Sequence, residues 1–253
     1  MRAPKPAALA LYVVTTASLP EAEIEAFAAL LDAEETARAT RLPPLHRRDF
    51  IAAHGLLRLA LSRACAGRPP RAWRFTSSAE GKPAPMEAEG LEVSLSHAQG
   101  LALAAVSRCG PVGVDGEPVA SSLALPQTAA LLSGPEEFAA WSALAPRPRA
   151  DAFFSLWTLK ESLLKAAGFG LTRDPRIIQC GLDPLRVLAL DLPARGKWLS
   201  WSATPAPGFR LALSVDARFA PEPPDARLVG NAAQMMLGEG TESVTLIPVP
   251  YAC

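Results

Sequence analysis

Three charged residues interrupt an otherwise apolar helical segment that runs from Phe153 to Gly168. Lys160, Glu161 and Lys165 are unexpected there, because charges are seldom buried unless they are paired or hold a ligand. Glu161 and Lys165 stand four residues apart and share one helix face. The segment by itself allows two interpretations: an internal ion pair, with Lys160 extending to water, or part of a ligand site.

A pair of carboxylates, Asp115 and Glu117, ends a predicted strand that begins at Val112. Alternate side chains of a strand point to the same face, so both carboxylates should lie together. Gly116 between them would let a ligand approach the backbone. Two such carboxylates suit a hard divalent cation such as Mg²⁺, which prefers oxygen ligands. The alternative is a turn with two solvated acids.

Basic residues concentrate between Arg38 and Arg74, where nine arginines accompany a single acid, Asp49. Within this region, residues 47–63 are predicted to form an amphipathic helix. Its basic face is either solvated or an anion site. Farther along the chain, Gly81-Lys82-Pro83 predicts a short turn that presents one ammonium group.

These groups could serve one ligand between them. Asp115, Glu117 and Glu161 could form a three-carboxylate metal site. A ligand with several phosphates would then be bound by the remaining cations, which are Lys82, His97, Lys160, Lys165 and the arginines of the first half.

The elements that must position these groups follow from periodicity and turn residues. Helices are predicted over Pro20–Thr40, 47–63, Pro135–Leu144 and Phe153–Gly168. Strands are predicted at Ala7–Val14, Leu91–Leu95, Leu101–Val106, Val112–Glu117, Arg186–Leu190, Trp198–Ala203 and Phe209–Val215.

An internal repeat predicts two halves of similar structure. Gly100–Val106 resembles Gly208–Val215, and each follows a helix that contains an aromatic residue and a Leu-Leu-basic triplet. The predicted fold class is therefore α+β, with two similar lobes and a ligand cleft between them. The predicted parts are an N-terminal lobe (1–117), a linker with a short helix (118–149), a C-terminal lobe core (150–220) and a tail (221–253) that could pack on the C-terminal lobe.

Composition argues against several classes of protein. The chain of 253 residues is 49% hydrophobic and has a formal net charge of zero, so its totals indicate neither nucleic acid nor a membrane surface as a partner. The N-terminal apolar run imitates a secretory signal, but its β-forming end suits a first strand. The cysteines show no metal-binding spacing, and a reducing, cytoplasmic location is expected.

Five motifs of this chain resemble the Sfp-type 4′-phosphopantetheinyl transferases. In the family's order and spacing they are the arginine-rich helix, GKP (Gly81–Pro83), SLSH (Ser94–His97), GVDGE (Gly113–Glu117) and WTLKESLLKAAG (Trp157–Gly168). The resemblance extends over roughly residues 45–215. Its most specific part is the Trp-x-x-Lys-Glu-x-x-x-Lys signature at this distance after Gly-x-Asp-x-Glu.

The resemblance implies two lobes related by a pseudo-twofold, with coenzyme A and Mg²⁺ bound at the lobe interface of a monomer. The enzyme would transfer 4′-phosphopantetheine from coenzyme A to a serine of an apo acyl or peptidyl carrier protein and release adenosine 3′,5′-bisphosphate. Neither nucleic acid nor a membrane is implied as a partner.

The resemblance also implies roles for single residues. Asp115, Glu117 and Glu161 would hold Mg²⁺ against the pyrophosphate. Glu161 is the candidate base for the serine proton, and Lys165 is a catalytic candidate that contacts the phosphates. The candidate contacts to coenzyme A are Arg48, with Arg47 as an equally placed substitute, Lys82, Ser96, His97, Lys160 and Lys165.

Two positions depart from the family's pattern: Gly116 stands where a larger residue is common, and His54 occupies a helix position that is often basic. Two other functions compete with the transferase. A non-catalytic relative would bind coenzyme A or a carrier protein without transfer. A nucleic-acid binder would use the basic region 38–74 and would show steeply salt-dependent binding.

Overall fold

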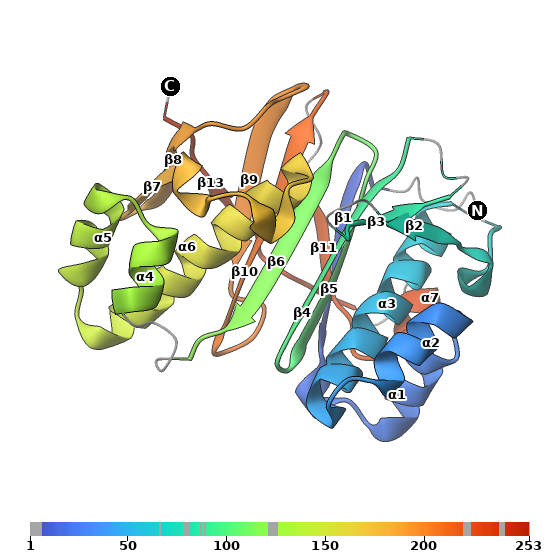
Figure 1. Ribbon diagram of the computed structural model, residues 1–253. Helices are drawn as coiled ribbons and strands as arrows, with labels where there is room; N and C mark the ends of the chain where they lie inside the picture. Colours follow the sequence, from blue (N-terminus) through green and yellow to red (C-terminus); the bar gives the residue numbers. More distant parts are fainter. Residues whose placement is uncertain are drawn as a thin grey trace.

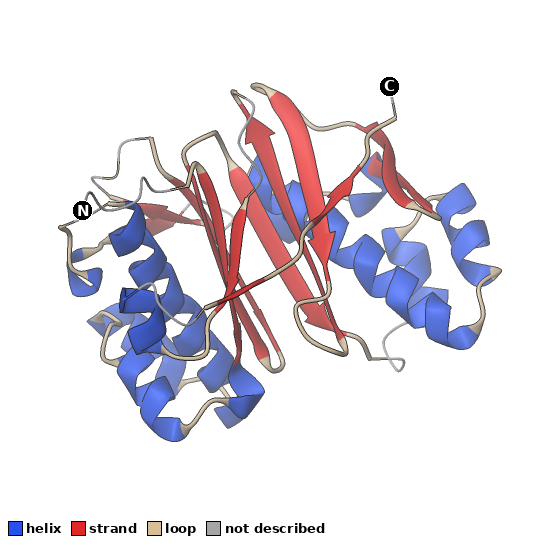
Figure 2. Ribbon diagram, turned by 180° about the vertical axis from the view of Figure 1, so that it is seen from behind, coloured by secondary structure: helices blue, strands red, loops and turns tan. Residues whose placement is uncertain are grey.

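The computed structural model describes residues 7–65, 67–77, 81–86, 88, 90–120, 126–219, 224–237 and 241–252, so Cys253 and parts of the predicted linker and tail lie outside it. Two β-sheets stand next to each other at its centre, and a group of helices covers the outer side of each (Figures 1 and 2). The fold is of the α+β class. No helix among the described residues combines the length and the apolarity needed to cross a membrane.

The same order of elements occurs twice along the described residues: a strand, three helices, a short hairpin and a long hairpin. The first series is β1 (Leu9–Thr15), α1 (Glu21–Ala28), α2 (Ala33–Thr40), α3 (Pro44–Ala64), β2 (Phe75–Ser77), β3 (Pro83–Pro85), β4 (Glu92–Ala98) and β5 (Leu101–Ser107). The second series is β6 (Val112–Pro118), α4 (Pro126–Leu132), α5 (Pro135–Ser142), α6 (Pro146–Ala167), β7 (Ile178–Leu182), β8 (Leu185–Leu190), β9 (Lys197–Ala203) and β10 (Phe209–Ala217). Strand pairing repeats as well, because β1 pairs antiparallel with β5 and β6 pairs antiparallel with β10.

The tail extends both sheets. Strand β11 (Asp225–Leu228) runs parallel to β1, β12 (Glu242–Ser243) pairs with β11, and β13 (Ile247–Val249) pairs with β9. The strand orders are therefore β12-β11-β1-β5-β4 and β13-β9-β10-β6. Helix α7 (Ala232–Leu237) packs on α1 and α3. The tail contacts both lobes rather than the C-terminal lobe alone.

Two boundaries differ from the sequence predictions. Strand β6 pairs along its whole length with β10, which places it in the second sheet although the sequence groups residues 1–117 in the first lobe.

The single helix predicted over Pro20–Thr40 is two helices, α1 and α2. Asp32 Oδ1 accepts a hydrogen bond from Glu35 N at 2.9 Å, and Glu35 Oε2 accepts one from Asp32 N at 3.1 Å. This capping box starts α2 and ends the continuity of the helix.

Three apolar clusters form the core. One lies between α1–α3 and the first sheet, one between α4–α6 and the second sheet, and one between the two sheets. In β1, Leu9, Leu11 and Val13 belong to the third cluster, while Tyr12 and Val14 belong to the first. This alternation follows the period of two of a strand, so each sheet has two buried faces.

The two sheets meet along β4 and β6, which lie side by side (Figure 1). Serine side chains of β4 connect the two strands. Ser94 Oγ accepts a hydrogen bond from Val114 N at 3.1 Å, and Ser96 Oγ donates one to Asp115 Oδ1 at 2.9 Å. The junction between the lobes therefore passes through Asp115.

Candidate functional site

Two glycines determine which face of β6 meets α6. A Cβ at Gly113 would stand 2.0 Å from Ser162 O of α6, whereas a Cβ at Gly116 would stand 2.5 Å from Leu103 Cδ1 of β5. Neither position has room for a side chain. Because side chains alternate along a strand, Asp115 lies on the face of Gly113 and points toward α6. A larger residue at Gly116 would require the side chains of Leu101 and Leu103 to shift within the apolar cluster between the sheets.

Asp115 is held by three elements. Its Oδ1 accepts hydrogen bonds from Lys165 Nζ of α6 at 2.6 Å and from Ser96 Oγ of β4 at 2.9 Å. Lys165 Nζ also lies 3.2 Å from Ser96 Oγ and 3.2 Å from Val114 O. The side chain of Asp115 is buried, while that of Lys165 is 25% exposed. Strands β4 and β6 and helix α6 thus bring together three residues that the sequence marks as candidates.

Glu117 and Glu161 lie close enough to Asp115 to respond to its charge. Burial, and after it the Asp115 carboxylate, raises the pKa of each glutamate to about 7, although Lys165 acts in the opposite direction. Asp115 Oδ2 is buried and has no hydrogen-bond partner among the described residues. The site therefore holds more carboxylate charge than the Lys165 ammonium neutralises.

This set of oxygens fits a hard divalent cation. A cation would satisfy the buried Oδ2 of Asp115 and would reduce the repulsion among the three acids. In the described parts of the chain, however, no three His, Cys, Asp or Glu side chains are arranged as a formed metal centre.

Lys160 does not face this site. Its Nζ donates to Glu137 Oε2 at 2.9 Å and to Leu132 O at 2.9 Å, and its side chain is fully buried. The expectation that Lys160 extends to water is therefore wrong, and its ammonium is not brought to the coenzyme A candidates. In place of the Glu161–Lys165 ion pair considered from the sequence, Lys165 pairs with Asp115.

Arg47 and Arg48, both on α3, hold neighbouring segments of the first lobe. Arg47 donates to three backbone carbonyl groups around the end of α2, each at 3.1 Å. Arg48 donates to Leu19 O at 2.7 Å and forms an ion pair with Glu21 at the start of α1. The structure therefore does not gather these two guanidinium groups with Asp115 and Lys165.

Lys82 reaches the site from the segment that leads into β3. Its Nζ donates to Val112 O at 2.9 Å and to Lys165 O at 3.2 Å. Burial lowers the pKa of this ammonium group. Lys82 thus connects the first lobe to both elements that carry the acidic site, β6 and α6.

Arg38 and three histidines lie near one another in the first lobe, and we call them the histidine cluster: Arg38, His46, His54 and His97. Burial, followed by electrostatic interactions with His54, Lys165, His46 and Arg38, lowers the pKa of His97 to about 4. The chain has three histidines in all, so every one of them contributes to this cluster. Their common surroundings suit an anion.

Phe50 connects the members of the histidine cluster. His54 stacks on its ring with centroids 4.0 Å apart, His97 meets it edge-on at 5.8 Å, and Arg38 Cζ lies 5.4 Å from its centroid. Sequence reasoning missed this cluster. The available signal was the spacing of His46, Phe50 and His54, which are four residues apart in turn and so share one face of α3.

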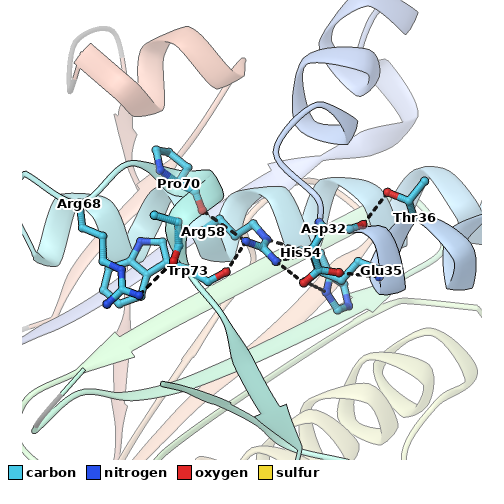
Figure 3. Close-up of polar contacts among 9 residues, drawn as sticks. Asp32, Glu35, Thr36, His54, Arg58, Arg68, Pro70 and Trp73 are labelled. Carbon is cyan, nitrogen blue, oxygen red and sulfur yellow. Dashed lines mark hydrogen bonds and ion pairs between the residues drawn. The ribbon is translucent and has the colours of Figure 1, made fainter. Parts of the chain in front are cut away.

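A polar network centred on the buried Arg58 includes His54 of the histidine cluster (Figure 3). Arg58 of α3 is fully buried, and its Nη2 contacts Asp32 Oδ2 at 2.8 Å and Glu35 Oε2 at 2.7 Å. Its Nη1 donates to Trp73 O at 2.7 Å. The second carboxylate oxygen of Glu35 lies 2.9 Å from His54 Nδ1. The network therefore connects the interior of the first lobe to the histidine cluster.

A family model described as the 4′-phosphopantetheinyl transferase superfamily matches residues 111–214 of this chain. The match begins just before β6 and ends within β10. It therefore covers most of the second series of elements, including Asp115, Glu117, Glu161 and Lys165.

Three curated proteins are similar to longer parts of the chain. The 4′-phosphopantetheinyl transferase HetI of Nostoc sp. is 35% identical over 158 residues, which is 61% of this chain and 66% of that protein. A putative 4′-phosphopantetheinyl transferase of Synechocystis sp., slr0495, is 30% identical over 59% of this chain and 61% of its own length. The L-aminoadipate-semialdehyde dehydrogenase-phosphopantetheinyl transferase of Eremothecium gossypii is 33% identical over 66% of this chain and 62% of its own length. The chain thus covers slightly less than two thirds of each relative.

Proposed function

Since residues 111–214 belong to the 4′-phosphopantetheinyl transferase superfamily, we propose that the protein transfers 4′-phosphopantetheine from coenzyme A to a serine of an apo acyl or peptidyl carrier protein. One observation carries this proposal. Ser96 of the first sheet and Lys165 of α6 both bond to Asp115, and Glu117 and Glu161 lie nearby. The names of the similar proteins agree with this activity.

In the proposed reaction the serine Oγ attacks the phosphorus atom that carries the pantetheine arm. The bond from that phosphorus to the bridging oxygen breaks, and adenosine 3′,5′-bisphosphate leaves with the electron pair. Glu161 accepts the serine proton, because it is an acid beside Asp115 and Lys165, where the reacting phosphate is proposed to bind. Lys165 donates to the pyrophosphate and stabilises its charge.

Asp115, Glu117 and Glu161 are the proposed ligands of Mg²⁺. When bound, Mg²⁺ would neutralise charge on the pyrophosphate as the bridging bond lengthens. The buried, unpartnered Oδ2 of Asp115 supports a cation at this position. The raised pKa values of Glu117 and Glu161 support it too, because a cation would favour the ionised form of both.

The histidine cluster is the proposed location for the other phosphate charge of coenzyme A. Arg38 and His97 belong to different elements and meet around one aromatic ring, which leaves them in position to bind an anion together. The repeated order of elements further supports a pseudo-twofold relation between the lobes, with the ligand at their interface, and one chain would then supply a complete site as a monomer.

The test is transfer of mass to a carrier. A panel of purified apo acyl and peptidyl carrier proteins is incubated with the protein, coenzyme A and Mg²⁺, and each carrier is weighed by intact-protein mass spectrometry. We expect the addition of one phosphopantetheine to at least one carrier, and its loss when a chelator or a serine-to-alanine carrier is used. Tight binding of coenzyme A with no adduct on any carrier would favour the non-catalytic relative.

A further inference from the structure

A chain of four hydroxyl groups crosses the second lobe from the tail to α6. Tyr251 Oη lies 2.7 Å from Ser200 Oγ of β9, and Ser200 Oγ lies 2.7 Å from Ser214 Oγ of β10. Ser214 Oγ in turn lies 2.7 Å from Ser162 Oγ of α6. The three serines are buried, and none of them takes part in the proposed reaction. The chain therefore connects the tail to the helix that carries Glu161 by polar contacts alone.

The hydroxyl protons all point the same way along this chain. Ser162 Oγ donates to Leu159 O at 2.8 Å, and a hydroxyl has only one proton to donate. Ser162 must therefore accept from Ser214, and Ser214 from Ser200. Tyr251 is then the donor that begins the chain, and burial raises the pKa of its phenol, which keeps the proton in place. Buried hydrogen bonds that are oriented in one direction strengthen one another.

The chain follows one row of the second sheet, directly opposite Ser162. Ser214 pairs in register with Gly113 of β6 on one side and with Ser200 of β9 on the other. At this level the backbone of α6 also touches the sheet, since a Cβ on Gly113 would stand 2.0 Å from Ser162 O. The same row therefore holds both the backbone and the side chain of Ser162.

Ser162 stands between the two charged residues of α6 that lie at the acidic site. Glu161 precedes it, and Lys165, which bonds to Asp115, follows it by one turn. Most other buried side chains of α6 are apolar, and apolar contacts have no preferred direction. A hydrogen bond, in contrast, has a preferred distance and angle. Toward the sheet, the hydroxyl chain therefore restricts the rotation and the axial position of α6 more closely than apolar packing does.

The tail holds Tyr251 in place from two sides. Strand β13 pairs with β9 on one side. On the other side, the backbone of Val187 in β8 accepts a hydrogen bond from Ala252 N at 2.7 Å and donates one to Pro250 O at 2.8 Å. The family model matches residues 111–214, so Tyr251 lies outside the matched part of the chain.

We propose that Tyr251 is a positioning residue for the transfer reaction. Through the two strand serines it holds Ser162, so that α6 presents Glu161 and Lys165 to the acidic site. The reaction itself rests on the function proposed above, whereas the connection from the tail to α6 does not. The tail thereby contributes to the rate of transfer from outside the site.

The kinetic test compares Tyr251→Phe with Val249→Ala. Tyr251→Phe removes only the hydroxyl that begins the chain. It should lower the saturated transfer rate by about three- to thirtyfold, less than the roughly hundredfold that a displacement of 1 Å can cost. KM for coenzyme A should stay within about twofold of wild type, because the loss arises in the transition state. An unchanged saturated rate would overturn the proposal.

Val249→Ala is the matched control, because it removes buried apolar volume from the same tail strand and leaves every hydroxyl of the chain in place. It should lower the melting temperature at least as much as Tyr251→Phe does. Its saturated rate should stay within about twofold of wild type. Equal losses of rate in the two variants would mean that Tyr251 only supports the fold.

A double variant tests whether Tyr251 acts through the chain. Ser162→Ala removes the hydroxyl at the α6 end and should itself lower the saturated rate. Since Ser162 and Tyr251 are separated by two other hydroxyls, coupling between them requires the chain. Tyr251→Phe should then lower the rate by less than about twofold in the Ser162→Ala background. Losses that multiply independently would overturn the role of Tyr251.

Hydrogen exchange separates this inference from the transferase proposal. In the protein without ligands, peptide amides of α6 should exchange faster in Tyr251→Phe than in wild type, while those of α3 should not change. Unchanged exchange in α6 would overturn the inference even if the wild type transferred phosphopantetheine. A wild type that modified no carrier would count against the proposed function, and faster exchange in Tyr251→Phe would still show that Tyr251 holds α6.

Discussion

Each lobe buries a cation on its long helix, and the two are connected to their surroundings in different ways. Arg58 on α3 pairs with Glu35 near the start of α2, and Lys160 on α6 pairs with Glu137 near the start of α5. Each glutamate also accepts a hydrogen bond from a backbone N–H at the start of its own helix. The repeated order of elements thus extends to a repeated buried ion pair.

The difference lies in the second oxygen of each glutamate. Glu137 Oε1 accepts a hydrogen bond from Cys180 N at 2.7 Å, so the second-lobe pair ends inside the core. Glu35 Oε1 instead meets His54, so the first-lobe pair continues to the histidine cluster. The guanidinium, with five donors, also reaches Asp32 and Trp73 O. Similar buried pairs therefore support stability alone in one lobe and, in our proposal, ligand binding in the other.

The largest effect is expected from Glu161, which follows Lys160 in α6 but lies near Asp115 and Lys165. Glu161→Gln should lower the transfer rate by about 10²–10⁴-fold, because it removes the proposed base. The fold should remain intact, since Lys165 keeps its bond to Asp115. Mass transfer to a carrier and a thermal unfolding curve measure the two effects. Normal transfer by this variant would end the assignment.

Arg58→Met should cost the most stability of the substitutions in the buried pairs. It leaves Glu35 without its main cation, and removal of one partner of a buried pair costs about 3–5 kcal/mol. Because Glu35 also contacts His54 of the histidine cluster, where a phosphate of coenzyme A is proposed to bind, KM for coenzyme A should rise in the folded protein. Urea unfolding and steady-state kinetics check both effects. If stability fell while KM for coenzyme A stayed unchanged, the Arg58–Glu35 pair would contribute to stability alone, as the Lys160–Glu137 pair is expected to do.

Lys160→Met should reduce stability by about 3 kcal/mol, because Glu137 then remains buried without a cation. It should leave KM for coenzyme A unchanged in the folded protein, since its ammonium lies in the core of the second lobe. Arg58→Met serves as the matched comparison. If the Lys160→Met protein were stable but bound coenzyme A more weakly, that result would support the sequence prediction that Lys160 contacts coenzyme A.

Acid should weaken the first lobe through Glu35. Its pKa falls from 4.5 to about 2 on folding, so its contribution to stability is present above pH 4.5 and is lost as pH falls toward 2. The contribution is about 3 kcal/mol, because each unit of pKa difference corresponds to about 1.4 kcal/mol. Urea unfolding between pH 6 and 3 should therefore show a steeper decline for the wild type than for Glu35→Gln. Parallel curves would contradict the depressed pKa.

Short-range patterns predict the local geometry well. The strand period predicts that Asp115 and Glu117 lie on one face of β6, and the Asp115 carboxylate does raise the pKa of Glu117. The apolar pattern correctly predicts α6 from Phe153 to its end at Gly168, where φ is 85°, but it misses the first turns of the helix, which begins at Pro146. These features depend on residues a few positions apart, and so they are visible in the sequence.

Long-range partners could not be predicted in the same way. Arg47 and Arg48 look like free cations in the sequence, but backbone carbonyl groups brought close by α1 and α2 bind them. Lys160 looks like a charge that must reach water, but Glu137 lies 23 residues earlier and meets it in the core. In each case the partner depends on how helices pack, which composition and periodicity do not specify.

The placement of β11 and β13 has a consequence for synthesis. Residues 225–249 reach the folding protein after β10, yet they supply neighbours to β1 in one sheet and to β9 in the other. A growing chain that has emerged only as far as β10 holds two sheets whose outer strands have unpaired backbone groups, and such edges pair readily with other chains. Ribosome-bound chains stopped after β10 should therefore associate with chaperones more strongly than chains extended past β13.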